Sequence, residues 1–259
     1  MLNFRNTSIA LIVFAVLVAI LLFFNIRLGM FPLLALIIWL ILLVIGSINI
    51  CSGFYLKAFC KARTGEKIIS LTFDDGPDPE VTPEVIKILR KYNISATFFI
   101  IGHKAVNHKE LLKKMIEEGH VIGVHSYQHA FFFDLYGRKK MERDLVKASE
   151  SVRVEWWNGG KVEPGKLFRP PYGVTNPTVA KVVKKLGYRV IGWSIRSLDT
   201  TIKDPMKVAE RVNNRLHPGA VILMHDTRKD LPVILEKVIK SAIEKGYRFV
   251  GLEVMLKFK

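Results

Sequence analysis

The pattern of apolar and polar positions divides the chain into an apolar amino-terminal part and an alternating remainder. Residues 1–50 contain no Asp or Glu and hold two long apolar runs, Ser8 to Phe24 and Phe31 to Ile48. Each run is about long enough for a helix that crosses the roughly 30 Å hydrocarbon core of a bilayer. No small-residue cleavage pattern separates the runs, which favours a membrane hairpin over a cleaved signal peptide. We therefore predict transmembrane helices at about 8–24 and 31–50 within a membrane segment, residues 1–56.

Beyond the apolar part, short β-branched or aromatic runs alternate with amphipathic stretches of helical period. The pattern predicts strands at Ile68–Phe73, Ala96–Ile101, Val121–Val124, Leu167–Arg169, Val190–Trp193, Ala220–Met224 and Phe249–Val254. It predicts helices at Thr82–Tyr92, His108–Glu118, Asp134–Val154, Asn176–Leu186, Pro205–Leu216 and Leu231–Lys245. Repeated β-α units of this kind imply a mainly parallel sheet covered by helices, either an open doubly wound sheet or a closed, irregular barrel.

The positions of the polar clusters favour the barrel. Each cluster described below follows directly after a predicted strand, which is the rim where barrels place their chemistry. About two hundred residues follow the apolar part, which suits one domain with a full core. We expect this single catalytic domain at residues 67–259, joined to the membrane segment by a short basic linker at residues 57–66.

Two consecutive acids and two histidines predict a metal site with its own base. Asp74 and Asp75 end the first strand before Gly76-Pro77, and His125 and His129 follow the third strand. Two imidazoles and one carboxylate with open positions form a recurrent catalytic metal site. In the turn after the first strand both acids can reach one pocket, so one can bind metal while its neighbour takes protons. Taken alone, an Asp doublet before Gly-Pro is typical of a strand-ending turn.

A third cluster, Phe168-Arg169-Pro170-Pro171-Tyr172-Gly173, contains two prolines that stiffen a loop and remove backbone donors. The Tyr172 N–H then remains as a fixed donor that suits an oxyanion. Arg169 could orient Asp74 and keep it ionised. The competing interpretation of this cluster is a Pro-rich turn with an ordinary surface arginine.

The last two clusters place Asp199 and His225 after apolar strands. A histidine in such a position is often a hydrogen-bonded rim residue. If Asp199 pairs with it, the pKa of His225 rises and the imidazolium can serve as a general acid.

Together the five clusters resemble the polysaccharide deacetylases of carbohydrate esterase family 4, the NodB homology domain, over roughly residues 66–256. The resemblance implies an α/β fold, a distorted (β/α)7 barrel, that hydrolyses N-acetyl or sometimes O-acetyl groups on aminosugar polymers with one divalent metal ion. It also implies the site roles: Asp74 as base, Asp75, His125 and His129 as metal ligands, Arg169 as partner of the base, His225 as acid, Asp199 as its tether, Tyr172 as oxyanion donor, and Tyr172, Leu223 and Pro171 as substrate-binding residues. Zinc is the expected ion, although such sites also accept cobalt, nickel, manganese or iron.

Two positions depart from the family pattern. Arg196 stands where the family usually has a second Asp, and Thr200 where it has a Trp. Trp156 and Trp157 could supply a sugar-stacking surface or act as core anchors. The aromatic run at residues 131–133 could be buried beneath the site or dip into the bilayer.

Charge limits the choice of partners. Of the 39 Lys and Arg residues only Arg5 and Arg27 lie in the first fifty positions, so the remainder carries a net charge of +14. Such a field favours phospholipid headgroups, lipid pyrophosphates or acidic wall polymers. We expect no nucleic acid as a partner because no nucleic-acid module is recognisable. We interpret Cys51 and Cys60 as plain juxtamembrane thiols; nine residues apart, they could be bridged in an oxidising compartment, but they form no disulfide framework and do not reveal the redox environment.

The sequence thus predicts a membrane-anchored, metal-dependent deacetylase of N-acetylated aminosugars in a cell-wall or capsule polysaccharide, in a bacterial plasma membrane. The alternative is a deacetylase or deformylase of a polyprenyl-phosphate-linked aminosugar at the cytoplasmic face. Arg5, Lys57, Lys61 and Arg63 lie on one side of the predicted hairpin and only Arg27 lies in its loop. This charge bias favours a cytoplasmic domain and so conflicts with a cell-wall substrate, which leaves the side of the membrane open. A glycan-binding scaffold with a degenerate site is disfavoured, because the ligand residues and both acids are present.

Overall fold

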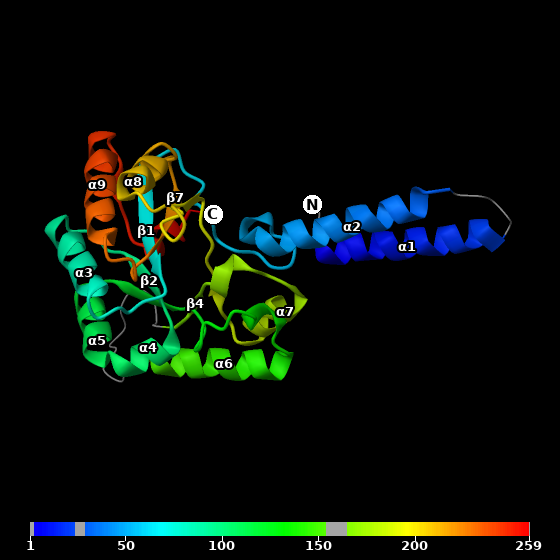
Figure 1. Ribbon diagram of the computed structural model, residues 1–259, viewed down its shortest axis with the longest axis horizontal. Helices are drawn as coiled ribbons and strands as arrows, with labels where there is room; N and C mark the ends of the chain where they lie inside the picture. Colours follow the sequence, from blue (N-terminus) through cyan, green and yellow to red (C-terminus); the bar gives the residue numbers. More distant parts are fainter. Residues whose placement is uncertain (1–2, 24–28, 154–164, 259) are drawn as a thin grey trace.

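Two apolar helices form a hairpin that projects from the rest of the protein. The computed structural model describes residues 3–23, 29–153 and 165–258. Helices α1 (Phe4–Phe23) and α2 (Phe31–Ile48) lie side by side. The amino-terminal end of α1 and the carboxyl-terminal end of α2 lie against the remaining domain (Figure 1). Both helices are long and apolar enough to cross a membrane, and most of their side chains are exposed.

The remaining residues form a parallel sheet wrapped by helices. Its strands are β1 (Ile68–Asp74), β2 (Thr97–Ile100), β3 (Val121–Val124), β4 (Leu167–Phe168), β5 (Arg189–Val190), β6 (Ile195–Arg196), β7 (Ala220–His225) and β8 (Arg248–Phe249). The strand order is β5-β4-β3-β2-β1-β7-β6, and β8 pairs with the start of β1. All of these strand pairs are parallel, and the architecture is the predicted distorted (β/α)7 barrel.

Helices cover the outer face of this sheet (Figure 1). They are α3 (Val81–Lys91), α4 (Gly102–Asn107), α5 (Lys109–Glu117), α6 (Arg138–Ser151), α7 (Pro177–Lys185), α8 (Pro205–Asn213) and α9 (Leu231–Glu244). The short helix α10 (Leu252–Met255) instead packs Leu252 and Met255 into the second core cluster, on the inner face of the sheet. Single turns of 3₁₀ helix lie at η1 (Ile50–Ser52), η2 (Phe133–Leu135) and η3 (Pro171–Gly173). The amphipathic periods of the sequence account for most of these helices, because each turns a row of apolar side chains towards the sheet.

The period-two pattern of β1 decides which side chains reach the interior of the barrel. Leu71 and Phe73 pack in the larger core between sheet and helices. Thr72 and Asp74 lie on the opposite face, where the side chain of Arg169 contacts both. Every residue of β1 is buried, so the strand carries Asp74 to the rim of the barrel without exposing it to bulk water.

Residues between the hairpin and β1 bridge a seam in the barrel. β5 and β6 are the two ends of the strand order, and the predicted linker lies between them. Phe59 N–H donates to Val190 O at 2.9 Å, and Gly192 N–H donates to Phe59 O at 2.9 Å. On the other side Ala62 N–H donates to Gly219 O at 2.9 Å, just before β7. The linker therefore packs into the barrel wall, although the domain boundaries themselves stay a prediction.

The prediction of free juxtamembrane thiols was wrong, because Cys51 and Cys60 form a disulfide with their Cα atoms 6.0 Å apart. The linker folds back over the seam, which the sequence spacing does not reveal. A Cβ atom at Gly192 would lie 2.5 Å from Cys60 Sγ, so the missing side chain makes room for the bridge.

Two predicted strands differ from the structure. Of the predicted strand Val190–Trp193 only Val190 lies in a strand, β5, because the Arg169 side chain donates to the carbonyl groups of Ile191 and Gly192 that a continuous strand would offer to a neighbour. β6 begins beyond the predicted range, at Ile195. The last predicted strand ends at Phe249, and its second half forms α10 after Gly251. The helix predicted at His108–Glu118 is preceded by the separate short helix α4.

Candidate active site

Five polar clusters meet at the carboxyl-terminal rim of the strands. Asp74 ends β1 beside His225, which ends β7 at the same register. His125 follows β3 and Arg169 follows β4. The parallel direction of the strands is the reason for this gathering, because residues that follow each strand reach the same end of the sheet. The prediction that the clusters share one rim is confirmed by their contacts.

Asp75, His125 and His129 form a compact ligand set. One ligand atom from each lies within 4.8 Å of the others. Asp75 Oδ1 is 3.2 Å from His129 Nε2 and 3.5 Å from His125 Nε2. His125 Nδ1 lies 2.7 Å from the Arg169 carbonyl oxygen, which assigns the proton to Nδ1 and leaves the Nε2 lone pair towards Asp75.

The chemistry of these side chains fits a divalent cation. Asp75 Oδ1 is buried and, within the described residues, accepts no hydrogen bond. Burial, with the nearby charge of His125, lowers the pKa of His129 to about 4, so its imidazole is neutral near pH 7. Neutral imidazoles and an unpartnered carboxylate oxygen are the donors that a zinc-like ion requires. These three residues could therefore hold a metal ion.

Asp74 is held by a buried arginine. Arg169 is fully buried, and its Nη1 donates to Asp74 Oδ1 at 2.6 Å and to Thr72 Oγ1 at 2.9 Å. The other Asp74 oxygen, Oδ2, is 3.9 Å from His125 Nε2. Burial lowers the pKa of Arg169, and the charge of Asp74 opposes that effect. Arg169 is thus no surface residue, and it directs one carboxylate oxygen of Asp74 away from the metal ligands and the other towards them.

His225 and Asp199 form a second charged pair. Nδ1 of His225 is 2.7 Å from Asp199 Oδ1, and the His225 backbone N–H donates to Asp199 Oδ2 at 2.7 Å. Burial lowers the pKa of His225, but the hydrogen bond and charge of Asp199 outweigh it and raise this pKa to about 9. His225 is therefore protonated at neutral pH and could donate a proton from Nε2.

This pairing predicts the alkaline limit of activity. If His225 must be protonated, turnover is expected to hold through neutral pH and to fall as the pH rises through about 9. Asp199→Asn removes the charge that raises the pKa of His225, so the alkaline limb should move down by at least about one pH unit. The pH profile of kcat for both proteins measures this shift. An alkaline limb at the same pH in Asp199→Asn would contradict the assignment of His225.

The Tyr172 loop offers a backbone donor at the same rim. Its N–H donates to no protein acceptor within the described ranges, and its ring lies 4.9 Å from the His129 ring. Gly173 has a φ of +71°, and a Cβ there would lie 2.3 Å from the Trp193 ring, so the turn requires glycine. Pro171 and Leu223, the other predicted substrate-binding residues, are both buried.

Unusual backbone conformations concentrate around this site. Asp75, Ser126, His129 and Tyr172 have φ values of 74°, 64°, 50° and 59°, which side chains other than glycine seldom adopt. Such conformations persist where the surrounding structure holds them, and they are frequent at functional sites. The sequence does not predict these conformations, because a positive φ is expected mainly at glycine and none of the four residues is glycine.

Asp226 is a site residue that the sequence analysis missed. It is fully buried, its Oδ2 accepts from Thr82 Oγ1 at 2.6 Å, and burial raises its pKa to about 7. A Cβ at Gly76 would lie 2.3 Å from Asp226 Oδ2, so this carboxyl packs directly against the turn that follows Asp75. Lys104 Nζ donates to Asp75 O at 2.7 Å on the same turn. The available signal was an acid directly after the candidate histidine at position 225.

The remaining predictions have separate outcomes. Phe133 is buried, as one alternative for the aromatic run expected, whereas Phe131 and Phe132 are 73% and 60% exposed, and their contact with a bilayer stays a prediction. Phe131 lies 6.0 Å from the Tyr172 ring at the mouth of the site. Arg196 and Thr200 are both exposed. Trp156 and Trp157 lie outside the described residues.

Comparison with known proteins identifies the family. The sequence profile described as polysaccharide deacetylase matches residues 61–191, about half of the chain. The chain belongs to the polysaccharide deacetylase family. It is 35% identical to a peptidoglycan-N-acetylglucosamine deacetylase of Bacillus cereus over 199 residues. This alignment covers 75% of the present chain and 90% of the Bacillus cereus protein. The chain is 33% identical over 202 residues to the peptidoglycan-N-acetylmuramic acid deacetylase PdaA of Bacillus subtilis, with 77% and 75% covered.

The solved structures agree with this membership. The crystal structure of the Bc1960 peptidoglycan N-acetylglucosamine deacetylase matches with a TM-score of 0.69 at 28% identity, over 78% of this chain and 93% of that one. The deacetylase is therefore a hydrolase of the carbohydrate esterase 4 class, which acts on amide bonds. The family profile ends at residue 191, so the positions of Asp199, Leu223 and His225 come from the structure rather than from that match.

Proposed function

We propose that this enzyme removes N-acetyl groups from aminosugars of a cell-wall polysaccharide, with the hairpin as its membrane anchor. The observation that carries the proposal is the joint placement of Asp74 with the ligand set Asp75, His125 and His129. The names of the relatives, peptidoglycan-N-acetylglucosamine and peptidoglycan-N-acetylmuramic acid deacetylase, support the substrate class. Phe131 and Tyr172, exposed beside the ligand set, offer aromatic surface to a sugar ring.

In the proposed hydrolysis one side chain, Asp74, accepts a proton and another, His225, donates one. A divalent ion held by Asp75, His125 and His129 would supply Lewis-acid polarisation of the acyl carbonyl and of a water molecule. Asp74, oriented by Arg169, accepts the proton of the attacking water. The Tyr172 N–H stabilises the developing oxyanion, and His225 donates the proton that the leaving amine requires. Asp199 holds the His225 ring and keeps it charged until that step.

Zinc is the ion we propose for this ligand set. The set contains two imidazoles and one carboxylate, a combination that also accepts cobalt, nickel, manganese or iron. Metal analysis of the purified full chain by inductively coupled plasma mass spectrometry identifies the resident ion.

Two observations bear on the side of the membrane. The disulfide between Cys51 and Cys60 favours an oxidising compartment and hence an external domain, where a wall polymer is accessible. The charge bias of Arg5, Lys57 and Lys61 favours the cytoplasm instead. That bias keeps a second candidate, deacetylation or deformylation of a polyprenyl-phosphate-linked aminosugar at the cytoplasmic face. We place the domain outside, because short-range charge bias tolerates exceptions while cytosolic disulfides are rare.

Sealed membrane vesicles test the substrate and the side together. Right-side-out vesicles that carry the full chain and metal are expected to release acetate from added peptidoglycan, which cannot cross the membrane. Inside-out vesicles should release acetate only after detergent opens them. The His129→Ala chain serves as the inactive control, because it lacks one proposed ligand.

The reverse pattern would contradict the external placement. Release from inside-out vesicles alone, with a lipid-linked aminosugar as the better substrate, would establish the second candidate. Absence of acetate release from peptidoglycan in both orientations, with detergent and metal present, would overturn the wall-polymer proposal.

A further inference from the structure

A basic groove lies where the hairpin meets the seam of the barrel. Its volume is about 1290 Å³, and its walls come from the end of α2, the following linker, the β6 region and α8. Six of its side chains are cations: Lys57, Lys61, Arg63, Arg196, Arg211 and Arg215. None of the described residues that line it is acidic. The groove therefore concentrates positive charge in one concave surface.

The cations of this basic groove lack acidic partners. Among the residues that the structure describes, none of the six forms an ion pair with Asp or Glu. Arg211 is fixed by a hydrogen bond from Nε to Arg196 O at 3.1 Å. Burial, together with the charges of Arg215 and Arg196, lowers the pKa of Arg211. An anion in the groove would relieve this mutual repulsion.

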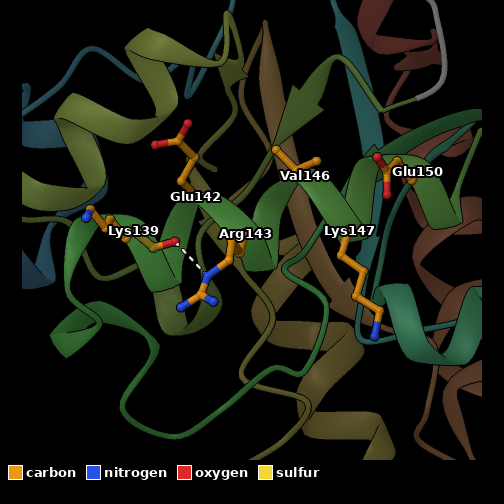
Figure 2. Close-up of a pocket in the computed structure, with 6 residues that line it drawn as sticks. All are labelled: Lys139, Glu142, Arg143, Val146, Lys147 and Glu150. Atoms are coloured by element: carbon orange, nitrogen blue, oxygen red, sulfur yellow. Dashed lines mark hydrogen bonds between the residues drawn. The ribbon is translucent and has the colours of Figure 1, made fainter.

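A second hollow, on the outer face of α6, differs from the basic groove in its charge balance (Figure 2). Its volume is about 790 Å³, and the side chains that line it all project from one helix (Figure 2). Glu142 and Glu150 lie among Lys139, Arg143 and Lys147, so the charges there are largely balanced. The basic groove has no such balance, and several separate elements enclose it.

An apolar surface leads out of the basic groove along the hairpin. Ile48 lines the groove and is 66% exposed, and the exposed side chains of Ile45 and Ile41 precede it on α2. A neighbouring hollow of about 650 Å³ adds Arg5 and Lys181 at the same junction, again without an acid among its described lining residues. A ligand that fits both surfaces has an anionic head and an apolar tail, which free phosphate does not provide.

We propose that the basic groove binds the phosphate headgroup of an anionic membrane phospholipid, whose acyl chains lie along α2. The inference rests on the proposed insertion of the hairpin into a membrane, which places the end of α2 at headgroup depth. An arginine guanidinium group can donate two parallel hydrogen bonds to two oxygens of one phosphate. Anionic headgroups also attract basic residues that lie next to a membrane helix. The bound lipid would hold the seam of the barrel against the membrane surface.

Native mass spectrometry of the full chain, released from detergent micelles, tests the proposal. The probes are dioleoylphosphatidylglycerol, the zwitterion dioleoylphosphatidylcholine, and inorganic phosphate. Phosphatidylglycerol is expected to bind at least about tenfold more tightly than phosphatidylcholine. Arg211→Gln/Arg215→Gln and, separately, Lys61→Gln/Arg63→Gln should each weaken it at least about fivefold. The control Lys109→Gln/Lys114→Gln removes the same charge from α5, on the far side of the barrel (Figure 1), and should change binding less than about twofold.

Several results would overturn the proposal. Phosphatidylglycerol binding within about twofold of wild type in both folded groove variants excludes the groove as the site. Equal binding of the two lipids excludes selection for negative charge. Inorganic phosphate that binds in the groove and displaces the lipid assigns the groove to a soluble anion instead. If circular dichroism shows that one groove variant does not fold, the other variant decides.

Retention of the full chain in alkali-washed membranes tests the membrane anchor by itself. A failure of the anchor and a failure of lipid binding in the groove are therefore distinguishable.

Discussion

His129→Ala is expected to reduce kcat by at least about 10³-fold and to release the bound metal ion. The Nε2 atom of His129 lies 3.2 Å from Asp75 Oδ1, so the substitution removes one of three donors from the proposed ligand set. The remaining His125 and Asp75 would leave a site with two protein ligands, too few to retain a zinc-like ion during purification. Metal content by mass spectrometry and acetate release from peptidoglycan, measured on the same preparation, check both effects.

His225→Ala is the matched control for this experiment. Its imidazole pairs with Asp199 and is no member of the ligand set, so metal content should stay close to one equivalent while kcat falls by about 10²–10⁴-fold. Loss of activity with loss of metal in both variants would show that His225 supports the ion rather than the proton transfer. A His129→Ala enzyme that keeps the wild-type rate would refute the proposed mechanism.

Arg169→Met is expected to lower the free energy of unfolding by about 3–5 kcal/mol and to lower kcat as well. Arg169 and Asp74 are both buried, and the substitution leaves the Asp74 carboxylate without its cation. The methionine also leaves the carbonyl groups of Ile191 and Gly192 without the hydrogen bonds that the guanidinium donates. Guanidinium unfolding of the full chain in detergent measures the stability, and acetate release measures the activity.

The double variant Asp74→Asn/Arg169→Met separates charge from packing. Because it removes both charges, it should be less destabilised than the sum of the two single variants by at least about 1 kcal/mol. Arg138→Met, at an exposed position of α6, should change stability by less than about 0.5 kcal/mol. A cost at Arg169 as small as that at Arg138 would mean that the buried pair contributes nothing to folding.

Where polar residues follow strand ends, the sequence was sufficient to predict which of them gather at one rim, while their catalytic roles stay a proposal. The acid doublet, the two histidines, Asp199 and His225 each stand after an apolar run, and parallel strands bring such residues to one rim. The hairpin was equally predictable, because two apolar runs of membrane-spanning length carry no acid. These features depend on local periodicity and on the direction of the strands, which a single chain displays directly.

Other features required contacts between distant residues. The hydrogen bonds of Arg169 to the carbonyl groups of Ile191 and Gly192 accompany the end of β5 at Val190, inside the strand predicted at Val190–Trp193. The disulfide depends on the linker folding back over the seam, and the basic groove depends on the meeting of α2, β6 and α8. None of these follows from periodicity, because each depends on which segments lie beside each other after folding.

The sequence by itself therefore determined the residue types of the site, the order of the strands and helices that carry them, and the apolar hairpin. Only the tertiary structure decided that Arg169 is fully buried beside Asp74 rather than on the surface, and that the cations along the seam have no acidic partner among the described residues. The physical reason is that local backbone preferences act between near neighbours in the chain. Burial, hydrogen-bond partners and charge compensation depend on segments that only folding brings together.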